Sequence, residues 1–293
     1  MRPRLLLSLC LALTTGQAFA APASLPNPSQ GAQDQRAARL ASTLEARRLM
    51  TSPAQISAWE ARAAATTGSD RLEQLRRISV EALTASDLPR AHRWMALYAE
   101  EIRARKDARH ARALVQLEAY ERGIEGDFGD SAAELTRLLA GERDPYLRAT
   151  GARLLAYSLT DAGLPVQALQ IIRSGLRDAD QDKDGAALKL GLADAGAYAS
   201  RELNDLPAFI DNIEIGIAAT RATDQPIDGR TALYNLTVLT SNLGRDALAS
   251  AQLQQFQRLS AETGNATEIG WANELCSTVK TSAGDYAEAL TCA

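Results

Sequence analysis

The sequence predicts an all-α fold, a solenoid of helical hairpins that repeat about every 40 residues. Residues that favour helices dominate the composition, and aromatic residues make up only 5% of the 293 positions. Short turn sequences recur along the chain at a nearly constant interval, and small residues recur at fixed distances from those turns. A set of unrelated helices would show neither regularity.

The N-terminal segment has the pattern of a secretory signal peptide, predicted over residues 1–20. Arg2 and Arg4 precede an apolar run, and Ala18-Phe19-Ala20 provides a cleavage site of the small-x-small type. We expect cleavage after Ala20 and a periplasmic mature protein. Three prolines lie among residues 21–30, so we expect a disordered lead-in over residues 21–33.

The mature chain is acidic, which limits its partners. The net charge of −4 becomes −6 without Arg2 and Arg4, since 30 basic residues then face 36 acidic ones. Nucleic acids require a basic surface, so we expect no nucleic-acid partner. A membrane span needs about 20 apolar residues, and no later stretch supplies them. We therefore expect no membrane span in the mature chain.

The turns define the repeat. Their central residues lie 40, 37, 41, 40 and 40 residues apart: Ser86, Gly126, Gly163, Asn204, Gly244 and Gly284. Small residues stand seven positions before each centre: Ser79, Ala119, Ala156, Ala197, Thr237 and Ser277. Five positions after each centre, all but one are small: Ala91, Ser131, Ala168, Phe209, Ala249 and Ala289. Antiparallel helices joined by a tight turn need small residues where their backbones approach, so each repeat is predicted to be a helical hairpin.

This pattern resembles the tetratricopeptide repeat, most clearly in residues 283–290, which read Ala-Gly-Asp-Tyr-Ala-Glu-Ala-Leu after Gly264-Asn265. The resemblance implies a right-handed α-solenoid over residues 69–293, although the family repeat is shorter, at about 34 residues. An earlier hairpin over residues 34–68, turning near Thr51-Ser52-Pro53, is expected to cap the array. The last repeat ends at Ala293, nine residues after its turn centre, so we expect it to be incomplete.

Ligands of this family usually lie along the concave face, which is made by the first helix of each unit. Three successive repeats carry tyrosine six positions before the turn, at Tyr120, Tyr157 and Tyr198. Ten positions before the turn, a mostly polar row includes Arg153, Asp194 and Tyr234. These six residues are our candidate binding residues, because tyrosine offers a large contact area and a hydroxyl group. The alternative is that the tyrosines fill space between neighbouring repeats.

The two cysteines of the mature chain lie eight residues on either side of Gly284, so a hairpin would bring Cys276 level with Cys292. In an oxidising compartment they could form a disulfide bond. The alternative is that both are small core residues with free thiols.

Candidate metal and catalytic residues are few. Residues 180–185 imitate the start of a calcium-binding loop, but the closing glutamate of that loop is replaced by Gly191. His92 and His110 lie on arginine-rich helical stretches, where packing or surface roles are the more common ones. No nucleophile or phosphate-binding motif stands out. We therefore expect no metal, no cofactor and no catalysis.

Two functions are compatible with these observations. The first is a non-catalytic periplasmic module that binds a peptide or protein partner on its concave face. The alternative rests on a resemblance of the array and its Thr263-Gly264-Asn265 tail to the sensory regions of bacterial membrane signalling proteins such as diguanylate cyclases. In that case this chain is an N-terminal fragment of a protein anchored in the inner membrane, whose membrane span and output domain would follow.

Overall fold

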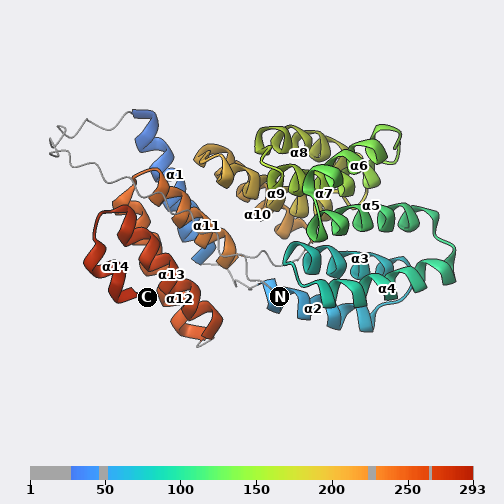
Figure 1. Cartoon of the computed structure of the whole chain (residues 1–293), viewed down its shortest axis with the longest axis horizontal. Helices are drawn as coiled ribbons and strands as arrows, with labels where there is room; N and C mark the ends of the chain where they lie inside the picture. The colour runs from blue at the N-terminus through green and yellow to red at the C-terminus, as the bar shows by residue number, and fades with distance from the viewer. Residues whose placement is uncertain (1–27, 46–51, 224–228, 264–265, 293) are drawn as a thin grey trace.

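The computed structural model describes residues 28–45, 52–223, 229–263 and 266–292, and those residues are folded into α-helices without a strand (Figure 1). The first seven are α1 (Pro28–Glu45), α2 (Ser52–Ala65), α3 (Gly68–Thr84), α4 (Leu88–Arg105), α5 (Ala108–Glu125), α6 (Phe128–Ala140) and α7 (Pro145–Asp161). The others are α8 (Pro165–Ala179), α9 (Gly185–Glu202), α10 (Leu206–Thr223), α11 (Gly229–Asn242), α12 (Asp246–Thr263), α13 (Ala266–Ser282) and α14 (Tyr286–Cys292). The all-α prediction is confirmed for this part of the chain, and the expected signal peptide lies outside it.

From α3 onward, each odd-numbered helix pairs with the next helix to form a hairpin. The turn centres have left-handed backbone, with φ between 53° and 80°, at five of the six predicted positions: Ser86, Gly163, Asn204, Gly244 and Gly284. In each of these turns the backbone amide of the third residue after the helix donates to a carbonyl of the last helical turn, as when the Asp87 amide donates to the Ala82 carbonyl over 2.9 Å. This bond caps the helix and lets the chain reverse within three residues. The sixth turn differs, because Gly126 has a φ of −140°.

The small residues predicted at the hairpin crossings lie in the core. Ala119, Ala156 and Ala168 are completely buried. The Ser131 hydroxyl on α6 forms a hydrogen bond of 2.9 Å with the Ser158 hydroxyl on α7. Larger side chains at these positions would not allow the two helices to approach so closely. A methyl group added at Gly123 would come within 2.7 Å of the Ser131 Cβ, so α5 and α6 are also in close contact. These contacts explain why small residues recur at that spacing.

Two hydrophobic clusters form the core. The first extends from α2 to α9, and the second consists of α1 together with residues of α9 to α13. Between the fourth and fifth hairpins the regular stacking changes, because α9 packs closely on α7 but makes only a small contact with α11. The all-helical, repeat-like architecture is therefore shown, with one interruption between α10 and α11.

Helix α1 occupies that interruption (Figure 1). Its apolar residues, spaced as one helical face, are buried against α10, α11 and α12: Ala37, Leu40, Ala41 and Leu44. Arg36 pairs with Asp211 at 2.6 Å and with Glu214 at 2.5 Å, both on α10. The Gln255 amide donates to the Ala41 carbonyl over 2.7 Å, which ties α1 to α12. Helix α1 thus completes the second core from a position remote in sequence.

Two expectations for the N-terminal part are corrected by this placement. The cap-like hairpin expected over residues 34–68 does not form, because α1 packs on α10–α12 while α2 packs on α3. The apolar residues Leu40 and Leu44 of α1 are buried in the second core instead. The disordered lead-in expected over residues 21–33 overlaps the helix from Pro28 onward. Proline is compatible with the first turn of a helix, so its presence there does not prevent one.

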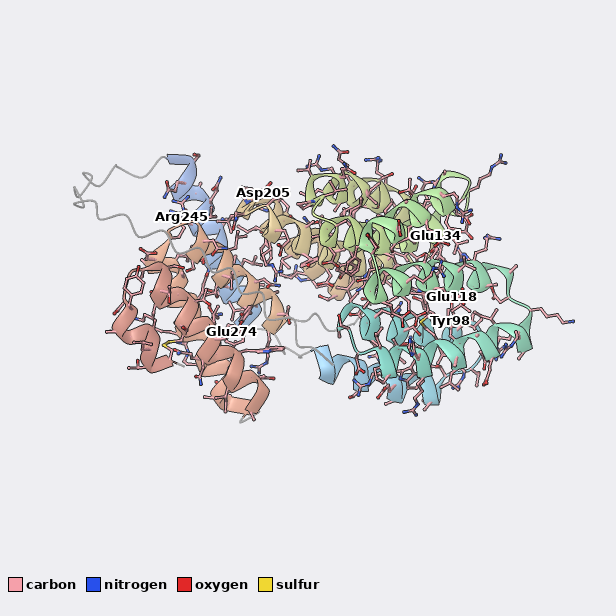
Figure 2. All side chains as sticks on the ribbon, viewed as in Figure 1. Tyr98, Glu118, Glu134, Asp205, Arg245 and Glu274 are labelled. Atoms are coloured by element: carbon pink, nitrogen blue, oxygen red, sulfur yellow. A yellow bond between two sulfur atoms is a disulfide. The ribbon has the colours of Figure 1, made fainter. Side chains whose placement is uncertain are left out.

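The last hairpin is joined by a disulfide bond between Cys276 of α13 and Cys292 of α14, whose Cα atoms are 5.7 Å apart (Figure 2). Two large hydrophobic residues of α14, Tyr286 and Leu290, are exposed. Among the described helices, none is both long enough and apolar enough to cross a membrane.

Candidate binding pocket

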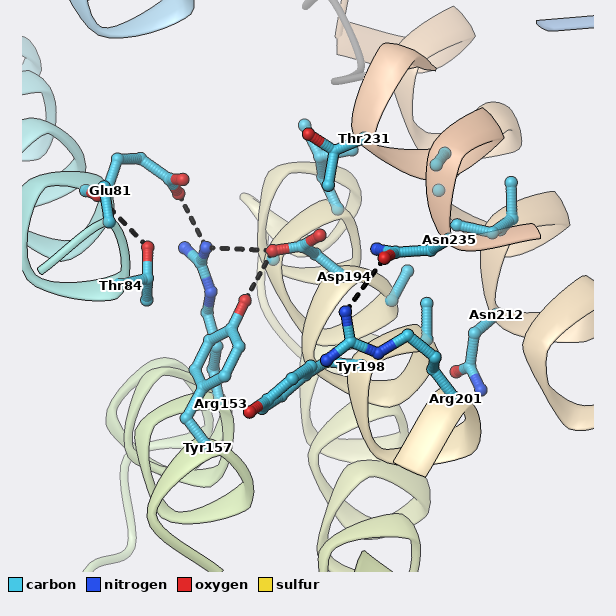
Figure 3. A pocket seen from close by; sticks show the side chains of 18 of the residues that line it. Glu81, Thr84, Arg153, Tyr157, Asp194, Tyr198, Arg201, Asn212, Thr231 and Asn235 are labelled. Atoms are coloured by element: carbon cyan, nitrogen blue, oxygen red, sulfur yellow. Dashed lines mark hydrogen bonds and ion pairs between the residues drawn. The ribbon is translucent and has the colours of Figure 1, made fainter. Parts of the chain in front are cut away.

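A pocket of about 570 Å³ lies on the inner face of the array. Most of its wall comes from the first helices of successive hairpins, α3, α5, α7, α9, α11 and α13, with further residues from α2, α6 and α10. The pocket lining therefore includes residues on both sides of the interruption between α10 and α11. Its wall combines aromatic rings with charged and amide side chains (Figure 3).

The structure brings all six candidate binding residues into the lining of this one pocket: Tyr120, Tyr157, Tyr198, Tyr234, Arg153 and Asp194. The rings of Tyr120 and Tyr157 lie 6.1 Å apart, and those of Tyr157 and Tyr198 lie 6.0 Å apart. These three tyrosines form the ladder expected from their spacing. The six differ in exposure, since Tyr120, Tyr157 and Arg153 are buried, Tyr198 and Tyr234 are half-buried and Asp194 is exposed. Tyr120 and Tyr157 thus also fill space between repeats.

In two of the ladder tyrosines, Tyr157 and Tyr198, the hydroxyl group is held by a carboxylate one repeat away. Tyr157 donates to Asp194, and Tyr198 donates to Asp161 over 2.7 Å (Figure 3). Both bonds join α7 to α9, in opposite directions along the chain. Burial, followed by the charge of Asp194, raises the pKa of Tyr157 well above its ordinary value. The tyrosines therefore remain neutral hydrogen-bond donors near pH 7.

Tyr234 repeats this arrangement between α11 and α13, because its hydroxyl hydrogen-bonds to Glu274. Burial and the charge of Glu274 raise the pKa of Tyr234 to about 12. A hydroxyl–carboxylate pair is thus present on each side of the interruption filled by α1. The pairs hold three carboxylates in fixed positions along the pocket.

Arg153 lies at the centre of the wall and joins three helices. Its Nη2 atom is 2.6 Å from the Glu81 Oε1 atom on α3 and 3.7 Å from the Asp194 Oδ2 atom on α9 (Figure 3). Burial opposes the charge of Arg153, but Glu81, Tyr157 and Asp194 more than compensate and raise its pKa. The side chain crosses α9 at Gly191, where an added Cβ would come within 2.8 Å of the Arg153 Cδ atom. A glycine at this point allows the arginine to lie flat against the helix.

Arg201 connects the two parts of the wall. Its Nη1 atom donates to the Asn235 Oδ1 atom over 2.9 Å, which links α9 to α11 (Figure 3). The guanidinium group also lies 5.0 Å from the centre of the Tyr198 ring, a cation–π distance. Where backbone packing between α9 and α11 is sparse, these side chains supply the contact.

Several pocket residues were not identified from the sequence, namely Glu81, Asp161, Arg201 and Asn235, whereas Glu274 belongs to the polar row ten positions before the turn. A signal for some of them exists in the spacing. Asp161 lies 37 residues before Tyr198, Asp194 lies 37 after Tyr157, and Glu274 lies 40 after Tyr234. A search for a carboxylate one repeat away from each inner tyrosine would therefore have added Asp161 to Asp194 and Glu274.

Both histidines lie outside the pocket lining and interact with neighbouring side chains. His110 is buried, and its Nδ1 atom lies 2.6 Å from the Tyr98 hydroxyl. Burial lowers the pKa of His110, so it is neutral at pH 7. His92 is exposed and lies 2.8 Å from the Glu121 carboxylate.

The loop that imitates a calcium site directs its carboxylates to basic side chains. Asp182 accepts a hydrogen bond from Arg109 over 2.7 Å, and Asp180 pairs with Lys189. Arg109 also pairs with Asp144 at 2.8 Å, so the loop is joined to α5 and to the residue that caps α7. Throughout the described ranges, no group of three or more histidine, cysteine, aspartate or glutamate side chains is placed to hold a metal ion.

Comparisons with known proteins add no further constraint. No family model matches the chain, and neither curated proteins nor solved structures give a significant match. The resemblance to the tetratricopeptide repeat therefore rests on the sequence pattern, and the functional argument rests on the geometry of the pocket.

Proposed function

We propose that this chain is an exported, non-catalytic module of tetratricopeptide-like repeats, forming a right-handed solenoid, that binds a peptide or a segment of a partner protein in the pocket on its inner face. The observation that carries the proposal is the pocket of about 570 Å³ walled by a tyrosine ladder. Binding pockets are typically about 300–1,000 Å³ in size, with mostly apolar walls and a few well-placed polar groups.

The shape and chemistry of the wall favour an extended peptide. The lining passes from α3 to α13, over many hairpins, so it offers contacts along a length of chain rather than around one compact group. Tyrosine rings provide contact area with little loss of side-chain entropy, and the Asn235 amide and several carboxylates provide polar contacts.

The wall is also organised before a ligand arrives. The hydroxyl groups of Tyr157 and Tyr198 are held by Asp194 and Asp161, and Arg153 is held by Glu81. Side chains already fixed in this way lose little further freedom on binding, and this saves about 0.5–1.5 kcal/mol per side chain.

Export is supported by the signal-peptide pattern of residues 1–20 and by the Cys276–Cys292 bond. Disulfide bonds persist in oxidising compartments such as the bacterial periplasm and are rare in the cytoplasm.

The proposal is tested by selecting binders from a random peptide display library on the immobilised full chain, and by measuring the affinity of the enriched peptides by fluorescence anisotropy. Tyr198→Ala removes a half-buried ring from the pocket wall. We expect it to weaken binding about ten-fold or more, equal to about 1.4 kcal/mol.

Tyr286→Ala is the matched control, because this tyrosine is 67% exposed on α14 and lies outside the pocket lining. We expect it to leave the affinity unchanged, and thermal melting confirms that both variants are folded. A library that yields no binder, or binders equally indifferent to both substitutions, would contradict the proposed function.

A further inference from the structure

The wall of the pocket is divided between two groups of helices. One part comes from α2 to α10 and includes Tyr198, and the other comes from α11 and α13 and includes Tyr234 and Trp271. From α2 to α14, no helix contacts its successor less than α10 contacts α11. A hydrogen bond of 2.9 Å from Arg201 to Asn235 also crosses this junction. The direct contact between the two parts therefore determines their relative position only weakly.

Helix α10 lies between the pocket and α1. Its residues Asn212 and Ile213 line the pocket. Its residues Asp211 and Glu214 instead pair with Arg36 of α1, at 2.6 Å and 2.5 Å. Successive residues of a helix are rotated by about 100°, so residues two positions apart face opposite sides. A movement of α1 therefore acts on the pocket wall through α10.

Helix α1 is also bound to the second group of helices. The Gln255 amide on α12 donates to the Ala41 carbonyl over 2.7 Å, and Arg258 on α12 lies 2.9 Å from Glu45. Helix α1 lies along α11 as well, with more contact than α10 makes with α11 (Figure 1). Helix α1 thus connects two groups of helices that have little direct contact with each other.

The apolar face of α1 reaches the pocket wall through a single hydrophobic cluster. Leu40 and Leu44 belong to the second core. The same core contains Phe209 and Ile213 of α10 and Ala232 of α11, all of which also line the pocket. Because protein interiors are closely packed, a displacement on one side of such a cluster is transmitted to the other side. The wall residues on both sides of the junction are therefore supported by α1.

From these contacts we propose that α1 is a brace that sets the opening of the inner pocket, with Arg36 and Leu40 as positioning residues outside the lining. A ligand that contacts Tyr198 and Tyr234 at once requires one fixed separation between the two parts of the wall. When α1 is displaced, only a fraction of the chains holds that separation, and the apparent affinity falls with that fraction. The effect on affinity rests on the proposed function, whereas the effect on the separation does not.

Four variants of the full chain test the brace. Arg36→Glu replaces attraction to Asp211 and Glu214 by repulsion, and adding Asp211→Arg and Glu214→Arg to it exchanges the charges and restores the attraction. Exposed ion pairs often contribute little, so Leu40→Ala is the second disrupting variant, at a side chain that is 3% exposed. Arg39→Glu is the matched control, because it makes the same change of charge on α1 at an exposed position for which no ion pair is found within the described residues.

The separation of the two groups is measured by double electron–electron resonance between spin labels at Ala104 on α4 and Ala251 on α12, which are both exposed. The labels are attached through a ketone-bearing amino acid, so the cysteines are left unmodified. We expect a narrow distance distribution in the unsubstituted chain and in Arg39→Glu. The distribution should be broad in Arg36→Glu and in Leu40→Ala, and narrow again in the charge-exchanged variant.

The display selection described above supplies the peptides, whose affinity is measured for the same variants. Arg36→Glu and Leu40→Ala should each weaken binding about five- to ten-fold, which corresponds to a braced fraction of about 10–20%. The charge-exchanged variant should regain the original affinity to within about two-fold, and Arg39→Glu should leave it unchanged. Thermal melting confirms that each variant is folded.

Distance distributions that stay narrow in both Arg36→Glu and Leu40→Ala would overturn the brace. Broadened distributions with unchanged affinity would overturn its control of the pocket and leave the proposed function standing. A loss of affinity that the charge-exchanged variant does not reverse would also overturn it, because the α1–α10 contact would then not be the cause. A library that yields no binder contradicts the proposed function, and the distance measurement then decides on the brace by itself.

Discussion

Replacing Leu44 by alanine tests whether α1 is a structural part of the second core. The side chain of Leu44 is completely buried against helices more than 160 residues away in sequence. Leucine-to-alanine substitutions at such sites cost about 2–5 kcal/mol, because apolar contacts are lost and a cavity remains. We expect about 3 kcal/mol for Leu44→Ala, a large part of the 5–15 kcal/mol that stabilises a typical domain.

The assay is urea denaturation of the full chain, followed by far-ultraviolet circular dichroism and by tryptophan fluorescence. Trp271 packs against the second core, while Trp59 and Trp94 belong to the first. The fluorescence change contributed by Trp271 should move to lower urea than the change contributed by the other two.

Leu290→Ala is the matched control, since this leucine on α14 is 81% exposed. It should change the free energy of unfolding by no more than about 0.5 kcal/mol. If Leu44→Ala were as mild as Leu290→Ala, α1 would not be packed on α10–α12, and the corrected placement of the N-terminal helix would be refuted.

Three further predictions concern the disulfide bond and the tyrosines. Reduction of the Cys276–Cys292 bond, whose cysteines are 16 residues apart, should destabilise the last hairpin by about 2–3 kcal/mol in chemical denaturation, and the oxidised chain without residues 1–20, which lacks Cys10, should show no reactive thiol; two reactive thiols would count against the bond. Tyr157→Phe removes the hydroxyl group that donates to Asp194 and should lower the free energy of unfolding by about 1–1.5 kcal/mol in urea denaturation, whereas Tyr157→Ala should lower it by about 3–5 kcal/mol; equal effects would mean that the ring is not buried. Because burial and the charge of Glu274 raise the pKa of Tyr234 to about 12 in the folded state, against about 10 in the unfolded chain, its stabilising contribution is complete below pH 10 and lost as the pH rises from about 10 to 12; Tyr234→Phe should flatten this part of the stability profile, and an unchanged profile would contradict the raised pKa of Tyr234.

The repeat could be predicted from the sequence because it depends on local chemistry. Glycine and asparagine mark turn centres because they adopt left-handed backbone at low cost, and Gly163, Asn204, Gly244 and Gly284 do so. Gly126 is also a glycine at a turn centre but does not adopt the left-handed conformation, so the residue type alone does not determine the backbone conformation of the turn. The burial of the flanking small residues followed from helix packing in the same way.

The placement of α1 could not be predicted by such reasoning. Its apolar face shows only that it packs on another apolar surface, and its hydrogen-bond partners on α10 and α12 lie 175 and 214 residues further along the chain. A local sequence pattern carries no information about which of several apolar surfaces is available. The nearest helix in sequence, α2, was therefore the natural but wrong expectation.

The candidate site was predictable in part. A repeat places equivalent positions on one face, which is why the tyrosine ladder and Tyr234 share a pocket. Asp161 and Glu81 were missed because they occupy other positions of the repeat and reach the pocket through the direction of their side chains. The alternative role of the tyrosines, filling space between repeats, also applies to Tyr157, because that ring is only 7% exposed.

Hydrogen–deuterium exchange of the full chain, with and without a peptide selected from the display library, tests the inner-face pocket most directly. The account predicts that the added protection falls on the helices that line the pocket, above all α7, α9, α11 and α13, with little change on the outer helices α4, α8 and α12. Protection concentrated on those outer helices, with the inner ones unchanged, would contradict it.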